Sequence, residues 1–130
     1  MALNYYKNEL KENAQLLASK GKGILAVDES TKTVGKRLAG IGVENTEENR
    51  KAYRGMLFTT EGLGKYISGA ILFEETLYQN HQDGESMVKK LNDLGIIPGI
   101  KVDKGLNPLP GGGDVETFCS GLDGLVERAA

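Results

Sequence analysis

The chain has 130 residues, and its 18 Asp and Glu residues against 16 Lys and Arg give a formal net charge of −2. This length bounds the chain at one domain, and balanced charge without an uncompensated basic block excludes a nucleic-acid binder that relies on a basic surface. No stretch approaches the ~18 consecutive apolar residues of a transmembrane helix, and the first residues form no apolar signal segment. The lone Cys119 cannot form an internal disulfide, so we expect a reducing compartment, with the cytoplasm as the default.

The spacing of apolar residues predicts helices that alternate with short buried strands. Amphipathic helices are expected at residues 4–20, at 31–39 behind a cap at Ser30 or Thr31, after a cap at Asn45 or Thr46, near 74–80, and at 85–94. Strands are expected at residues 24–27, 67–73 and 99–104. The end of the chain is predicted as a loop at residues 107–114 and the beginning of a helical segment at 118–130.

Apolar strands that alternate with helices are typical of right-handed βαβ units on a parallel sheet, so the expected fold class is α/β. Three strands are too few for a complete barrel of eight strands, which needs ~250 residues. They are also too few for most doubly wound sheets. The sequence is therefore interpreted as a part of a larger fold.

Ionisable residues follow, or lie within, the end of each predicted strand. Asp28 follows the first strand, Glu74 and Glu75 follow the second, and Lys101 and Asp103 lie in the third. The carboxyl ends of parallel strands meet at one mouth, where the chemistry of such folds is found. A buried amine at Lys101 would need a carboxylate partner, and Asp28 is proposed for it. The alternative, that these are solvated turn residues, stays open at this point.

Other polar residues have simpler interpretations. His81 lies in a polar stretch and is expected to face solvent in a loop, while Arg37 and Arg50 fit helix surfaces. Glu74 and Glu75, as neighbours on a strand, would point to opposite faces and form no cooperative pair. One histidine and one cysteine provide neither a metal cluster nor a Cys/His dyad, so no metal is expected.

Five stretches carry a resemblance to a known family: GKGILAVDEST (21–31), ENTEENR (44–50), ILFEETLYQ (71–79), PGIKVDKG (98–105) and GLDGL (121–125). In this order they resemble class I fructose-1,6-bisphosphate aldolases. The resemblance covers nearly all 130 residues but only about the N-terminal third of the family's chain. It implies the first three parallel strands of a (β/α)8 TIM barrel with their helices, in one incomplete domain over residues 1–130.

The resemblance also implies roles for individual residues. Asp28 matches an active-site aspartate of proton transfer and Schiff-base chemistry, and Lys101 matches a neighbour of the Schiff-base lysine. A nearby cation such as Lys101 lowers the pKa of a lysine nucleophile, and a carboxylate can hold that cation and move protons. The residues matched to substrate-phosphate binding are Arg37, Arg50, Ser30, Thr33 and Lys36.

The activity implied is a metal-independent, cofactor-free lyase of glycolysis and gluconeogenesis that cleaves fructose 1,6-bisphosphate to dihydroxyacetone phosphate and glyceraldehyde 3-phosphate through a Schiff base. The family's Schiff-base lysine comes from a later strand, so the chain alone is expected to be inactive. A homotetramer is expected for the intact protein, in the cytoplasm or in a plastid. The alternative function is a non-catalytic fragment that binds the actin cytoskeleton, and an unrelated sugar-phosphate barrel enzyme would require the five matches to be coincidence.

Overall fold

The computed structural model describes residues 6–125, and the chain forms two compact units, residues 1–100 and 101–130. Within the described range, no helix has the length and apolar character needed to cross a membrane.

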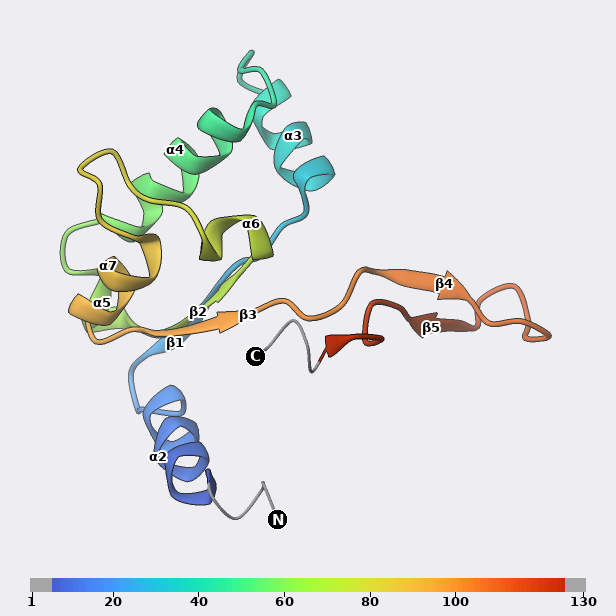
Figure 1. The fold of residues 1–130 in the computed structure, drawn as a ribbon, viewed down its shortest axis with the longest axis horizontal. Helices are drawn as coiled ribbons and strands as arrows, with labels where there is room; N and C mark the ends of the chain where they lie inside the picture. Colours follow the sequence, from blue (N-terminus) through green and yellow to red (C-terminus); the bar gives the residue numbers. More distant parts are fainter. Residues whose placement is uncertain (1–5, 126–130) are drawn as a thin grey trace. The chain divides into compact units, whose positions relative to one another are not determined.

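The first unit is built on a parallel sheet in the order β1–β2–β3, with β1 at Gly23–Val27, β2 at Ile67–Leu72 and β3 at Ile97–Ile100. Between β1 and β2 the chain forms α3 (Thr31–Ala39), α4 (Glu47–Phe58) and α5 (Leu63–Tyr66). Between β2 and β3 it forms α6 (Glu74–Leu77) and α7 (Met87–Asp93). Helices α4 and α7 lie on the same side of the sheet (Figure 1), as parallel strands joined by helical crossovers require.

The core of this unit lies between one face of the sheet and the two helices α4 and α7. Alternation along β1 and β2 turns Val27, Ala70 and Leu72 toward the helices, where they pack with Phe58 of α4 and Leu91 of α7. Val27 pairs with Leu72, and Leu72 pairs with Ile100, so the carboxyl ends of all three strands are level. Residues that follow these strands therefore begin at one edge of the sheet.

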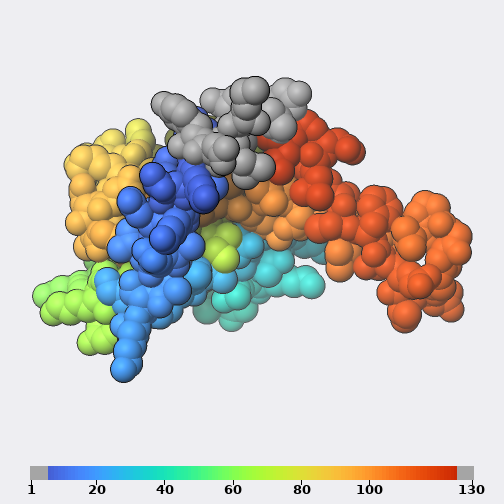
Figure 2. Space-filling view, turned by 90° about the horizontal axis from the view of Figure 1, so that it is seen from below, coloured from blue at the N-terminus to red at the C-terminus, as the bar shows by residue number. Residues whose placement is uncertain are grey.

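Helix α2 (Lys7–Leu17) packs against the amino end of β2. The Ser68 hydroxyl donates to the carbonyl of Leu17 at 2.7 Å, and at Gly69 a side chain would collide with that of Leu17. Figure 2, which views the molecule from this side, shows α2 in blue at the front of the unit. An alanine at position 69 would therefore require the Leu17 side chain to move.

Helix starts follow from capping side chains. Ser30, Thr46 and Ser86 each accept a hydrogen bond from a backbone N–H three residues on, at the beginning of α3, α4 and α7. For α3 and for α4 the sequence offered two candidate capping residues each. In the structure the caps are Ser30 and Thr46.

The predicted third strand is displaced in the structure. It was expected at residues 99–104 but runs from Ile97 to Ile100, so that Lys101 and Asp103 follow the strand. The reason is its partner: β2 ends at Leu72, opposite Ile100, because Phe73 already lies at the position directly before α6. No strand residues remain beside which residues 101–104 could continue the ladder.

The second unit contains an antiparallel hairpin of β4 (Leu106–Pro108) and β5 (Thr117–Cys119). The predicted loop at 107–114 and helical segment at 118–130 are therefore wrong where they overlap these strands, and residues 126–130 lie outside the described range. Backbone hydrogen bonds between Gly105 and Ser120 and between Lys104 and Ser120 extend the pairing beyond β4 and β5. These non-local bonds hold a segment whose sequence favoured a loop.

Candidate functional site

Asp28 directly follows β1 and is half-buried at the carboxyl end of the sheet. The two residues on either side of it are fixed from α4 by Arg54. The Nε of Arg54 donates to the carbonyl of Val27 at 3.3 Å, and its Nη2 donates to the carbonyl of Glu29 at 2.6 Å. The backbone that carries the Asp28 carboxylate is therefore braced from both sides.

Arg54 is fully buried, and its guanidinium carbon lies 5.4 Å from the centre of the Phe73 ring, at the end of β2. Burial lowers the pKa of Arg54 from its ordinary value, and the nearby carboxylates of Glu75 and Glu29 partly oppose that shift. Arg54 was not predicted as a site residue from the sequence. The available signal was its position four residues before Phe58, on the side of α4 that faces the core.

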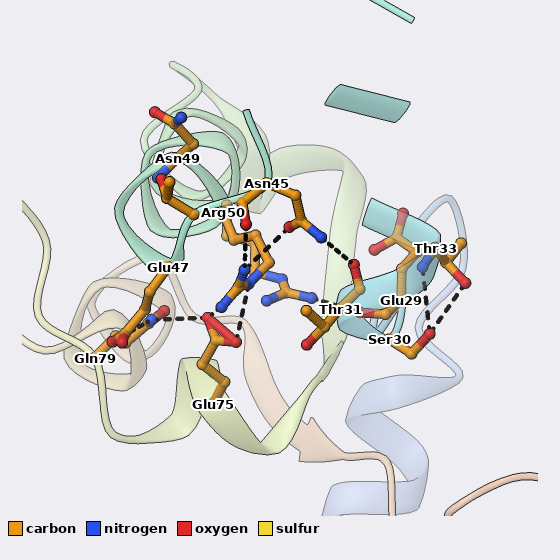
Figure 3. Close-up of polar contacts among 12 residues, drawn as sticks. Glu29, Ser30, Thr31, Thr33, Asn45, Glu47, Asn49, Arg50, Glu75 and Gln79 are labelled. Atoms are coloured by element: carbon orange, nitrogen blue, oxygen red, sulfur yellow. Dashed lines mark hydrogen bonds and ion pairs between the residues drawn. The ribbon is translucent and has the colours of Figure 1, made fainter. Parts of the chain in front are cut away.

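A second polar cluster joins α4 to α6 (Figure 3). The Nε of Arg50 lies 3.1 and 3.0 Å from the two carboxylate oxygens of Glu75, and its Nη1 donates to the side chain of Asn45 at 3.0 Å. Gln79 donates to Glu75 at 3.1 Å and to Glu47 at 3.3 Å. Glu74 and Glu75 both lie in the first turn of α6 and not on a strand, which removes the basis for expecting them on opposite faces.

The predicted phosphate-binding residues on and beside α3 lie at both ends of the helix, with Ser30 and Thr33 at its start and Lys36 and Arg37 in its last turn. The Ser30 hydroxyl is 3.1 Å from that of Thr33, and Lys36 is exposed. The Nη2 of Arg37 is 3.1 Å from Oε1 of Glu29, and the Arg37 side chain is 59% exposed. Through its ion pair with Glu29, the Arg37 guanidinium reaches from the last turn of α3 to the residue that precedes Ser30.

In the second unit, Lys101 forms an ion pair with Asp103, with 2.7 Å between Nζ and Oδ1. The other oxygen of Asp103 accepts the backbone N–H of Gly105 at 3.0 Å. The hydrogen bond from Lys101, followed by that from Gly105, lowers the pKa of the Asp103 carboxyl. The expected pairing of Lys101 with Asp28, which belongs to the first unit, stays a prediction.

His81 differs from its expected place in solvent. Its side chain is only 22% exposed, with Nδ1 3.3 Å from Oδ1 of Asp83. It packs on Gly55 of α4, where a Cβ atom would come within 2.8 Å of the imidazole. Across residues 6–125, no group of three or more His, Cys, Asp or Glu side chains is arranged to hold a metal ion.

Comparison with known proteins identifies the family of this chain. The model of fructose-bisphosphate aldolase class-I matches residues 9–130 of the chain. The chain belongs to this family. Its three parallel strands and their helices are accordingly part of an aldolase TIM barrel, as predicted.

Curated aldolases of plants are similar over almost the whole chain. Fructose-bisphosphate aldolase 3, chloroplastic, of Arabidopsis thaliana is 61% identical over 125 residues, which are 96% of this chain and 32% of that protein. The chloroplastic aldolase of Spinacia oleracea is 62% identical over 125 residues, with the same coverage. The chain spans about a third of the length of the curated relatives it matches.

A solved aldolase structure is also similar. It is that of Plasmodium falciparum fructose-bisphosphate aldolase in complex with TRAP and a small-molecule inhibitor, with a TM-score of 0.89 and 59% sequence identity. The similarity covers 93% of this chain and 35% of the Plasmodium chain.

Proposed function

We propose that this chain supplies the first three strands, and part of the active site, of a class I fructose-bisphosphate aldolase. The proposed reaction is the cleavage of fructose 1,6-bisphosphate to dihydroxyacetone phosphate and glyceraldehyde 3-phosphate, through a Schiff base and without a metal. The observation that carries the proposal is the family match over residues 9–130, and the half-buried carboxylate at the end of β1 is consistent with it.

Asp28 and Lys101 are proposed as the catalytic residues of this part of the enzyme. The braced backbone at Asp28 supports a role in proton transfer, because such a group must be held at a fixed distance from the reacting atoms. Lys101 is proposed to lie beside the Schiff-base lysine of a later strand, where its charge would favour the neutral, nucleophilic form of that lysine.

The substrate phosphates are proposed to bind at Arg37 and Arg50, with Ser30, Thr33 and Lys36 in the same region. The exposed Arg37 guanidinium and the hydroxyls at the start of α3 support this, since phosphate oxygens accept hydrogen bonds from both. Arg50 would have to share its guanidinium between a phosphate and its present contacts with Glu75 and Asn45.

The Schiff-base lysine is proposed to lie outside these 130 residues, so the chain alone should not turn over substrate. The intact protein is proposed to be a homotetramer. Because the similar plant aldolases are chloroplastic, a plastid is proposed as its compartment in place of the cytoplasm.

A binding role is the second candidate. It is favoured by the Plasmodium falciparum relative, whose structure contains TRAP as a bound partner. For this chain, the family resemblance implies binding to the actin cytoskeleton as the form of this role.

The experiment joins this chain to the remaining two thirds of the Spinacia oleracea aldolase and measures triose phosphate release in a coupled assay. We expect the chimaera to be active, Asp28→Asn and Lys101→Met variants to lose most of that activity, and the unjoined 130-residue chain to be inactive. An inactive chimaera that is folded would contradict the proposed function. A filament pull-down of the unjoined chain, with bovine serum albumin as the control, tests the binding role.

A further inference from the structure

Arg54 occupies a position that core packing alone does not explain. It is a cation with no exposed surface, on the face of α4 that also carries Phe58. Its Nη1 has no hydrogen-bond partner among the described residues. A buried cation with an unsatisfied N–H group opposes folding, and an apolar side chain of similar length would fit a purely structural position better.

The contacts that Arg54 does make converge on one short segment. Its two hydrogen bonds go to the carbonyls of Val27 and Glu29, the neighbours of Asp28 on either side. Its guanidinium also lies over the Phe73 ring, at the end of the adjacent strand. Arg54 therefore connects the end of β1 with the end of β2. It holds the peptide group that precedes Asp28 and the peptide group that follows Glu29, so the backbone on both sides of Asp28 is held.

We propose that Arg54 is a positioning residue, which holds the Asp28 carboxylate in its working orientation without touching the substrate. This inference rests on the proposed aldolase function. A lysine at this position keeps the charge, but a single ammonium group on a flexible stem cannot reproduce the planar arrangement in which Nε and Nη2 donate to two separate carbonyls. The geometry thus requires arginine in particular.

The matched control is Phe58→Leu. Phe58 lies one turn further along α4 and is fully buried, but it belongs to the apolar core and makes no hydrogen bond to the Asp28 segment. Both substitutions disturb the packing of α4, and only Arg54→Lys disturbs the two carbonyls. Comparing the two variants therefore separates the effect of a displaced Asp28 carboxylate from the effect of a less stable fold.

The first measurement uses the active chimaera with the Spinacia oleracea aldolase. For Arg54→Lys we expect kcat to fall about 10- to 100-fold, as for a displaced catalytic group, with KM unchanged within about twofold. Phe58→Leu should keep the kcat of the parent at the same temperature. Parent-like kcat in Arg54→Lys, or an equal loss in both variants, would overturn the inference while leaving the proposed function intact. An inactive parent chimaera would instead overturn the proposed function, and with it this inference.

The second measurement uses the 130-residue chain itself and the NMR order parameters of backbone amides. In Arg54→Lys we expect the order parameters of Asp28 and Glu29 to fall from about 0.85 toward about 0.6, with those of β2 unchanged. Phe58→Leu should leave Asp28 and Glu29 as they are. Unchanged order at these two residues in Arg54→Lys would contradict the inference without reference to activity.

Discussion

The guanidinium of Arg50 and the carboxylate of Glu75 form an ion pair between α4 and α6, with the Arg50 Nε 3.1 and 3.0 Å from the two carboxylate oxygens. The two side chains are only 11% and 19% exposed. An ion pair so shielded from water differs in its energetics from the many pairs on the surface of the unit.

Replacing Glu75 with Gln should destabilise the chain by about 1–3 kcal/mol, because it leaves a shielded arginine without its counter-charge. The matched control is Glu48→Gln, which removes an ion pair with Lys51 in which the Glu48 side chain is 70% exposed. That variant should lose at most about 1 kcal/mol. Urea unfolding of both variants measures the difference, and equal losses would show that the shielding of Glu75 has no energetic effect.

Acid should weaken the ion pair between Asp83, in the segment before α7, and Lys90. The hydrogen bond from Lys90, followed by that from the Glu85 backbone, lowers the pKa of Asp83 to about 2. A carboxyl group whose folded pKa lies below its unfolded value of about 3.9 contributes stability above that value, and loses it as the pH falls from about 4 to about 2.

The difference in unfolding free energy between the parent and Asp83→Asn should therefore be constant from neutral pH down to about 5 and shrink below about 4. Titration of the Asp83 carboxyl carbon by NMR checks the same claim directly. A midpoint near 4 instead of near 2 would mean that Lys90 does not hold this carboxylate in solution.

Gly64→Ala should destabilise the chain, although alanine favours helices more than glycine does. Gly64 lies in α5, where a Cβ atom would collide with the backbone carbonyl of Leu94. A backbone atom cannot move aside as a side chain can, so we expect a loss of about 1–3 kcal/mol in thermal or urea unfolding. Gly99→Ala is the control, since its Cβ would be 3.5 Å from the nearest backbone atom, an ordinary contact.

Thr46→Ala should cost about 1 kcal/mol, because it removes the cap of α4. The Thr46 hydroxyl accepts the Asn49 N–H at 3.2 Å at the start of that helix. Thr46→Ser keeps the hydroxyl and should restore most of the loss. If serine and alanine unfold at the same urea concentration, the cap contributes nothing measurable to the folded state.

Local sequence signals predicted the helices and strands whose bounds depend on neighbouring residues. The capping hydroxyls and apolar spacing predicted α3 with its observed bounds, Thr31–Ala39, and the apolar run before Asp28 predicted β1 to within one residue. Parallel pairing of the strands followed from the alternation of strands and helices. The family resemblance then placed the fragment in a barrel.

Features that depend on distant residues could not be predicted in this way. The end of β3 at Ile100 is determined by the end of β2, and the hairpin of β4 and β5 depends on pairing between residues 11 positions apart, as at Asn107 and Phe118. Arg54 was missed for a similar reason. Spacing places Arg54 on the same face of α4 as Phe58, but its contacts with the carbonyls of Val27 and Glu29 appear only when α4 lies against β1.

One helix, α4, carries both Phe58 of the apolar core and, four residues earlier, Arg54, which donates hydrogen bonds to the carbonyls on either side of Asp28. Any change that shifts or tilts this helix moves both side chains together. A substitution that shifts α4 as a whole should therefore lower thermal tolerance and turnover together, whereas one that only shortens a core side chain, such as Phe58→Leu, should lower thermal tolerance alone. Substitutions on the outer surface of α4 that stabilise the helix should raise heat resistance without disturbing either side chain.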